Sequence, residues 1–135
     1  MKTIVVQARE EELFPVQQEV SGFLEEAGVQ ATIIDKVELV IEELLVNIMQ
    51  YGYESGPGTI TIEYELNESR VFTLIIADEG KKFNPLEKDD PDIDVPASDR
   101  QIGGLGIYLV KQIMDSVDYS YRDNKNIMTM KKKLA

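Results

Sequence analysis

Two side chains that could act together in catalysis stand four positions apart in the segment ELLVNIMQYGY, residues 43–53. Positions four apart lie on the same face of a helix, so Glu43 and Asn47 would be about 6 Å apart at Cβ. Gln50 continues this polar line, while most surrounding residues are apolar. Unpaired polar groups are costly in apolar surroundings, so these side chains need partners. The pair predicts either an ordinary solvated stripe or a site in which the amide oxygen binds a metal ion and the carboxylate accepts a proton.

A second group of candidate residues, Asp78-Glu79-Gly80, directly follows the apolar run LIIA. Asp is unusual after such a run, and the ends of sheets are common places for ligands to bind. The same spacing is also common in simple turns, where Asp and Gly are favoured for local reasons. Either a ligand site or an ordinary turn is therefore expected here.

Glycines form a third group, Gly103-Gly104-Leu105-Gly106, just before a segment with helical spacing. Glycines ahead of a helix let backbone amides approach a phosphate, which the helix dipole also favours. The pattern is not Walker A, because no Gly-Lys-Ser/Thr follows it. It is not the dinucleotide fingerprint either, because Leu109 occupies the third glycine position. The run predicts a phosphate-binding helix start or, alternatively, only a turn.

Strands and helices can be placed around these groups from the spacing of apolar residues. Strict alternation in residues 59–66 predicts an antiparallel strand with one buried face. Asp35-Lys36-Val37-Glu38 fits a capping box, which predicts the start of the second helix. The predicted strands are residues 2–8, 59–66, 71–78, 117–122 and 126–134, and the predicted helices are 12–27, 35–51 and from the glycines to about 116.

The order of these elements is β-α-α-β-β-α-β-β, in which hairpins dominate. It predicts an α+β fold, a two-layer sandwich of a mixed, mostly antiparallel sheet with three helices on one face. Residues 1–135 are expected to form a single domain, because the length is typical of one. Residues 81–103 contain three Pro and five Asp without periodic spacing, which is typical of a functional or mobile segment.

The composition excludes several kinds of site. The chain has no His and no Cys, so a disulfide, a Cys/His zinc site, a Cys nucleophile and a Ser-His-Asp triad are impossible. Its formal net charge of −11 suits neither nucleic acid nor an anionic membrane. We expect a cytoplasmic protein, since the absence of Cys is compatible with a reducing cytosol and the N-terminus lacks a secretory signal. A phosphate ligand would need local help from backbone amides, a metal ion or a few basic side chains.

The order and spacing of the three groups are more specific than any one of them. Glu-x-x-x-Asn on a helix precedes strand-Asp-x-Gly, a long segment, and Gly-x-Gly-x-x-Leu-Val at a helix start. This arrangement resembles the Bergerat-type ATP-binding domain of gyrase, histidine kinases and mismatch-repair ATPases. Within that superfamily it is most similar to the short, stand-alone anti-sigma factor serine/threonine kinases of bacteria. The resemblance covers nearly the whole chain, through ELLVNIMQYGY, DEGKKFNP, IGGLGIYLVKQIMD and NIMTMKKKL in this order.

The resemblance implies ATP and Mg²⁺ as cofactors and a role for each group. Asn47 is expected to bind Mg²⁺, and Glu43 to act as general base. Asp78 is expected to accept a hydrogen bond from the adenine amino group, and Gly80 to let adenine approach the backbone. Residues 81–103 would form the ATP lid. The residues expected to surround the phosphates are Gly103, Gly104, Leu105 and Gly106.

Several positions depart from the family pattern. Lys82 stands where many relatives have a second glycine, which makes the front of the lid less flexible. Lys81, Lys82 and Arg100 either contact the phosphates or offset the nearby Asp residues. A glycine often found near the last strand is absent, and Thr129 is the expected nucleotide contact there.

The resemblance implies an ATP- and Mg²⁺-dependent protein serine/threonine kinase that acts as an anti-sigma factor. It would phosphorylate a small anti-anti-sigma partner of the STAS type and, once that partner is phosphorylated, hold a sigma factor. Two alternatives stay open: a nucleotide-gated interaction switch without kinase activity, and a structural interaction domain with a decayed site. A homodimer through the uncovered face of the sheet is also open, although the polar face of residues 59–66 argues mildly against a large apolar contact. Neither nucleic acid nor a membrane is an expected direct partner.

Overall fold

A computed structural model of the chain describes residues 1–53, 58–87 and 104–134. Within these ranges the chain forms five strands, three α-helices and two short 3-10 helices. In chain order they are β1 (Lys2–Gln7), η1 (Glu10–Glu12), α1 (Leu13–Glu26), α2 (Ala31–Tyr51), β2 (Thr59–Leu66), β3 (Val71–Asp78), η2 (Pro85–Glu87), α3 (Gly104–Ile113), β4 (Ser116–Arg122) and β5 (Lys125–Lys133).

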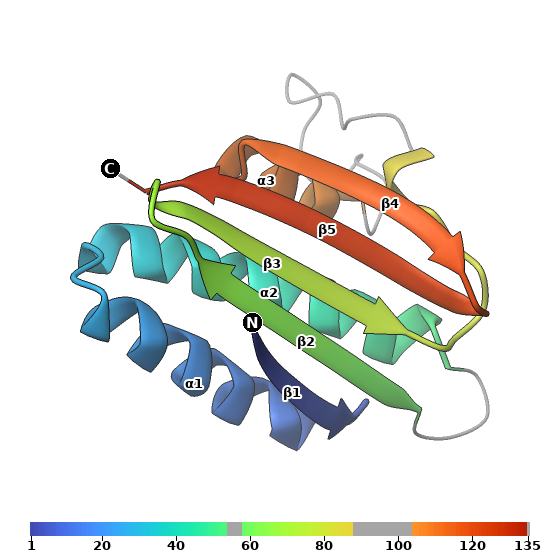
Figure 1. Cartoon of the computed structure of the whole chain (residues 1–135). Helices are drawn as coiled ribbons and strands as arrows, with labels where there is room; N and C mark the ends of the chain where they lie inside the picture. The colour runs from blue at the N-terminus through green and yellow to red at the C-terminus, as the bar shows by residue number, and fades with distance from the viewer. Residues whose placement is uncertain (54–57, 88–103, 135) are drawn as a thin grey trace.

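The five strands form one sheet in the order β1-β2-β3-β5-β4, and every pair of neighbours is antiparallel. The three α-helices cover one face of this sheet, and the opposite face is turned toward the viewer in Figure 1. The predicted α+β fold with its helices on one face is therefore confirmed. No parallel pair occurs among the described strands, whereas the sequence predicts a mixed sheet.

An apolar core fills the space between the sheet and the helices. β2 buries Ile60, Ile62 and Tyr64 on one face, as its alternation predicts. α2 lies behind the middle strands and buries Ile41 and Leu45 completely (Figure 1). Burying each such side chain stabilises the fold by roughly 1.5–3 kcal/mol. This packing fixes the face that α2 turns toward the sheet, and with it the direction of its polar line.

α1 ends at Glu26, one residue before the predicted bound, and Gly28 follows as the residue that terminates it. The amide of Gly28 donates to the Glu25 carbonyl, and the amide of Val29 donates to the Leu24 carbonyl, both at 3.0 Å. This is the Schellman arrangement, which requires a left-handed residue after the helix. Gly28 supplies it with a φ of 78°, a conformation that a side chain would strain.

Two helix boundaries differ from the prediction. α2 begins at Ala31, so the segment 35–38 is not its start, and its N-cap residue, Gln30, makes no side-chain capping bond. Its apolar stripe begins earlier than the capping pattern indicates, because Ile34 already packs into the core. Packing therefore outweighs capping here. α3 ends at Ile113 rather than near residue 116, because the chain joins β4 at Ser116.

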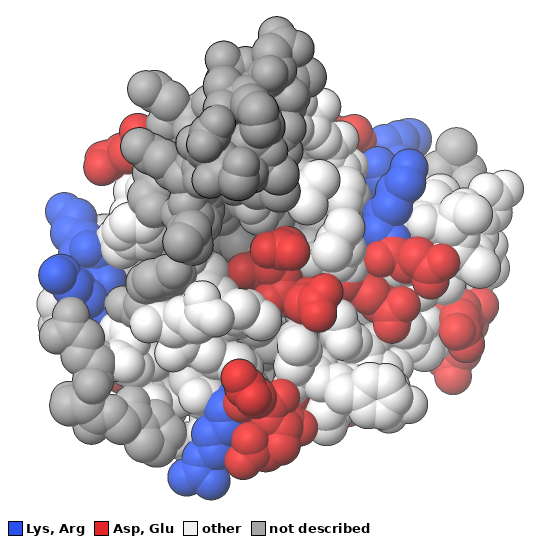
Figure 2. All heavy atoms as spheres, turned by 180° about the vertical axis from the view of Figure 1, so that it is seen from behind, with Lys and Arg blue, Asp and Glu red and all other residues white. Residues whose placement is uncertain are grey.

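Of the predicted lid, residues 81–87 are described and include the short helix η2. Residues 88–103, with Arg100 and Gly103, lie outside the described residues. Acidic side chains gather over the helix-covered face, while Lys and Arg lie nearer the edges (Figure 2). In the described part of the chain, no helix combines the length and apolar character needed to span a membrane.

Candidate functional site

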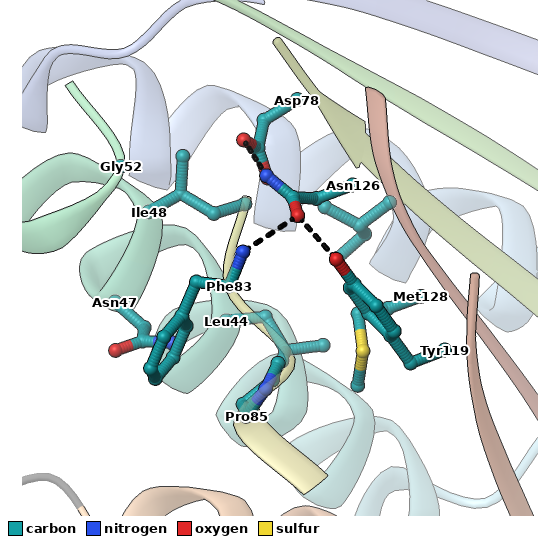
Figure 3. Close-up of a pocket in the computed structure, with 11 residues that line it drawn as sticks. Leu44, Asn47, Ile48, Gly52, Asp78, Phe83, Pro85, Tyr119, Asn126 and Met128 are labelled. Atoms are coloured by element: carbon teal, nitrogen blue, oxygen red, sulfur yellow. Dashed lines mark hydrogen bonds between the residues drawn. The ribbon is translucent and has the colours of Figure 1, made fainter. Parts of the chain in front are cut away.

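A small pocket opens between the C-terminal half of α2 and the end of β3 (Figure 3). Its volume is about 40 Å³, which is room for about three water molecules. Apolar side chains from α2 and the sheet form most of its walls. Its lining residues are Leu44, Asn47, Ile48, Gly52, Ile76, Asp78, Phe83, Pro85, Tyr119, Asn126 and Met128.

Asp78, the last residue of β3, places a buried carboxylate in this pocket, with 6% of the residue exposed. Its Oδ1 accepts hydrogen bonds from the Gly80 amide at 2.9 Å and from Asn126 Nδ2 at 3.0 Å. Burial raises the pKa of Asp78, and these two hydrogen bonds oppose the rise because they stabilise the ionised form. Both of these bonds from described residues use Oδ1, so Oδ2 is the oxygen that can accept a hydrogen bond from a ligand.

Asn126 is a buried polar residue that the sequence analysis does not single out. It lies beside Asp78 because the two residues are paired where β3 meets β5. Its Oδ1 accepts hydrogen bonds from the Phe83 amide at 3.0 Å and from the Tyr119 hydroxyl at 2.5 Å (Figure 3). The available signal was its position in NIMTMKKKL, where it precedes Met128 and Met130 on the buried face.

Gly80 lies where the turn after β3 meets the end of α2. A Cβ on Gly80 would overlap the carbonyl oxygen of Gly52. The Lys81 amide donates to that same carbonyl at 3.0 Å. Glycine is therefore required here to let the two backbone segments approach, in addition to any role toward a ligand.

Tyr53 hydrogen-bonds to the backbone beside the pocket and is a second residue that the sequence analysis misses. Its hydroxyl donates to the Thr59 carbonyl at 2.8 Å and accepts from the Glu79 amide at 2.7 Å. It thus joins the start of β2 to the turn that carries Asp78. Burial raises the pKa of this hydroxyl most, and the nearby acidic residues add to the rise.

Glu43 and Asn47, the two candidate residues of α2, lie one helical turn apart as their spacing predicts. Asn47 lines the pocket beside the ring of Phe83 (Figure 3). Glu43 stands one helical turn earlier and is half-buried. Burial raises the pKa of Glu43, and the neighbouring charge of Glu42 adds to this rise.

The structure brings Glu43 together with the glycine run. α3 begins at Gly104, as the run predicts, and Leu105 and Gly106 belong to its first turn. A Cβ on Gly106 would overlap Glu43 Oε2, so any larger residue there would displace the end of the Glu43 side chain. The carboxylate therefore faces the N-terminus of a helix, where backbone amides are unpaired and the dipole favours negative charge.

Three residues predicted to contact the nucleotide, Lys81, Lys82 and Thr129, are not among those that line the pocket. Lys82 Nζ sits 5.2 Å from the ring centroid of Tyr121, in a cation–π contact. Lys81 has an exposed side chain, while its backbone bonds to Gly52 and Asn126. Thr129 alternates with Met128 and Met130, so it faces the uncovered side of the sheet, away from the pocket.

Residues 6–132 match the family of histidine kinase-like ATPase domains. The serine-protein kinase RsbW of Bacillus cereus is 28% identical over 130 residues, which are 93% of this chain and 81% of that protein. The serine-protein kinase RsbW of Halalkalibacterium halodurans is 29% identical over 133 residues, covering 96% of this chain and 80% of that protein.

Solved structures share the fold at low sequence identity. A structure of the RsbU and RsbW domains of a Mycobacterium tuberculosis protein aligns with a TM-score of 0.67 and 13% identity, over 99% of this chain and 33% of that one. The histidine kinase domain of the blue-light activated kinase of Erythrobacter litoralis aligns with a TM-score of 0.59 and 12% identity, over 90% of this chain and 61% of that one. Because the family match spans nearly all of the chain, the chain belongs to the family of histidine kinase-like ATPase domains.

Proposed function

We propose that the chain is an ATP- and Mg²⁺-dependent protein serine/threonine kinase. In this proposal it acts as an anti-sigma factor, phosphorylates an anti-anti-sigma partner of the STAS type and holds a sigma factor. The observation that carries the proposal is the position of Glu43, half-buried between the pocket residue Asn47 and Gly106 in the first turn of α3. The similarity to proteins named serine-protein kinase RsbW supports the same activity.

The pocket has the chemistry that an adenine base requires. Asp78 presents a carboxylate oxygen to the pocket, and this acceptor suits the exocyclic amino group of adenine. Leu44, Ile48 and Met128 provide apolar surface for the flat faces of a base. Phe83 and Pro85 line the pocket, and an outward shift of either would widen it for the base.

Asn47 is the residue that would hold Mg²⁺. Mg²⁺ usually takes one or two protein oxygens and completes its shell with phosphates and water. The amide oxygen of Asn47 suits that arrangement, because the side chain lines the pocket one turn from Glu43. When bound, the metal and the nucleotide would supply charge neutralisation and the phosphoryl group that is transferred.

Glu43 would take the proton from the hydroxyl of the partner's Ser or Thr. Its raised pKa makes it a stronger base than an ordinary Glu. As the hydroxyl oxygen bonds to the γ-phosphorus, the bond from that phosphorus to the β,γ-bridging oxygen breaks. The start of α3 would stabilise the negative charge with its backbone amides.

The proposal is tested in two steps. An ATP- and Mg²⁺-dependent rise in melting temperature that is absent in Asn47→Ala establishes the nucleotide site. Radiolabelled ATP, Mg²⁺ and purified STAS-domain partners then test for transfer to a Ser or Thr. Nucleotide binding without transfer to any partner would refute the kinase proposal.

A second candidate function is a nucleotide-gated interaction switch. The position of Phe83 and Pro85 at the pocket favours it, because their movement on nucleotide binding would change a nearby surface without chemistry. Glu43→Gln separates the two functions. If the protein is a kinase, the variant loses signalling and keeps its ATP affinity. If it is a switch, the variant keeps both signalling and ATP affinity.

A further inference from the structure

The side chain of Asn126 joins three separate parts of the candidate site. Its Nδ2 donates to Asp78 Oδ1 at 3.0 Å and to the Lys81 carbonyl at 2.9 Å. Its Oδ1 accepts from the Phe83 amide at 3.0 Å and from the Tyr119 hydroxyl. The residue is only 6% exposed, so these partners replace water around the amide.

The direction of this amide group is chemically determined. The backbone amide of Phe83 can only donate, so it must face the oxygen of Asn126. The Nδ2 group then has to face Asp78, where it can only donate. A donor aimed at Asp78 Oδ1 stabilises the ionised carboxylate, which counteracts the effect of its burial.

We propose that Asn126 is a positioning residue for the base of the nucleotide, which keeps Asp78 as an acceptor facing the pocket and ties it to the backbone of residues 81–83. The inference rests on the proposed function, since it concerns the base at the same site. An acceptor at this position selects a base that presents an amino group over one that presents a carbonyl oxygen. Asn126 also bonds to the backbone of Lys81 and Phe83. The position of the Asp78 acceptor, which selects the base, is therefore coupled to the position of the Phe83 ring.

Asn126→Asp tests this role, because it keeps the shape and replaces the donor with an acceptor. Where the introduced carboxylate and that of Asp78 are both ionised, they repel each other, and the Asp78 side chain is no longer held in place. We expect Mg-ATP affinity at least about 10-fold weaker than wild type near pH 8. The ratio of wild-type to variant affinity should shrink as the pH falls, because a proton shared by the two carboxylates then replaces the lost donor. A ratio near one, or the same at every pH, overturns the proposal.

Other titratable groups in this corner do not produce that profile. The pKa values of the Tyr53 and Tyr119 hydroxyls are raised above their ordinary value of 10.0. The charges of Glu79 and Glu87 also act here, but they are the same in wild type and variant, so the ratio removes them. Titration of the ATP phosphates cancels in the same way.

Asn124→Asp is the matched control, because it makes the same chemical change in an exposed turn two residues away. Asn124 has a φ of 62°, which Asp tolerates nearly as well. We expect its affinity ratio to stay near one at every pH.

Asn126→Thr provides a second measurement that needs no nucleotide and does not depend on the folding of Asn126→Asp. Its hydroxyl can bond to Asp78 but cannot also reach the Phe83 amide, which then loses the Asn126 oxygen and keeps its hydrogen bond to the Tyr119 hydroxyl. We expect that amide to exchange with solvent faster than in wild type, by NMR hydrogen exchange. Unchanged exchange overturns the tie to residues 81–83.

The proposal and the proposed function fail in different ways. If wild type does not bind ATP at any pH, both are wrong. If wild type binds ATP and Asn126→Asp follows it at every pH, only the role of Asn126 is wrong.

Discussion

The carboxylate of Glu43 lies directly against Gly106, so closely that a Cβ on Gly106 would overlap Glu43 Oε2. Glu43 belongs to α2 and Gly106 to the first turn of α3, and the strands β2 and β3 and the predicted lid lie between these helices in the chain. The contact brings the proposed general base to the helix start that is proposed to bind phosphates. A single methyl group at this position should therefore affect the chemistry more than the fold.

Gly106→Ala should lower phosphotransfer by at least about 10-fold, because the added methyl group displaces the base from its position. Alanine is also the better helix former by about 0.5–1 kcal/mol, so loss of stability should be small. Initial rates of transfer and urea unfolding measure the two effects. Gly22→Ala in α1 is the matched control, since a Cβ there meets no atom within 4 Å. A control that loses activity equally would contradict this explanation.

Glu42→Gln should move the acid side of the rate–pH profile to lower pH. The charge of Glu42 contributes to the raised pKa of Glu43, and its removal lowers that pKa. Glu43 accepts a proton only when ionised, so the rate rises with pH through its pKa and then levels off. The profile of kcat/KM for the partner measures the shift. A shift to higher pH, or none, would show that Glu43 is not the group that titrates.

Asp78→Asn should abolish adenine binding while it stabilises the unliganded protein at neutral pH. Burial raises the folded-state pKa of Asp78 above its ordinary value of 3.8, so the folded state holds the proton more tightly than the unfolded state. Stability of the wild type therefore falls as pH rises through that range. The neutral amide removes this loss, so the variant's advantage is present at neutral pH and disappears below about pH 3.8. Melting temperatures of wild type and Asp78→Asn from acidic to neutral pH test whether the variant is the more stable protein at neutral pH. ATP titration tests the loss of binding.

Tyr53→Phe should destabilise the protein by about 1–3 kcal/mol, because it leaves the Glu79 amide and the Thr59 carbonyl without their partner. The turn that carries Asp78 loses a support, so ATP affinity should fall as well. Urea unfolding and ATP titration measure both. Equal stability of variant and wild type would mean that water replaces the hydroxyl without loss.

Much of the site was predictable because it depends on short-range spacing. Glu43 and Asn47 share a face of one helix, and Asp78 ends a strand whose apolar character marks it as buried. The glycine run correctly predicts the start of α3 at Gly104. These relationships follow from helix and strand geometry alone.

Asn126 and Tyr53 were not predictable in the same way. Asn126 is 48 residues from Asp78 in the chain, and only the register of β5 against β3 makes them neighbours. Tyr53 reaches its partners 6 and 26 residues away through the path of the chain after α2. Thr129 is a different case, because strand alternation with Met128 and Met130 is enough to place it on the opposite face.

The proposed role of Glu43 as general base is tested most directly by Glu43→Gln, which keeps the size of the side chain and removes its ability to accept a proton. Single-turnover phosphotransfer to a STAS-domain partner should be measured beside the Kd for Mg-ATP. We predict that ATP affinity stays within about 3-fold of wild type while transfer falls at least about 100-fold. Transfer within a few-fold of wild type, with ATP still bound, would contradict the role of Glu43.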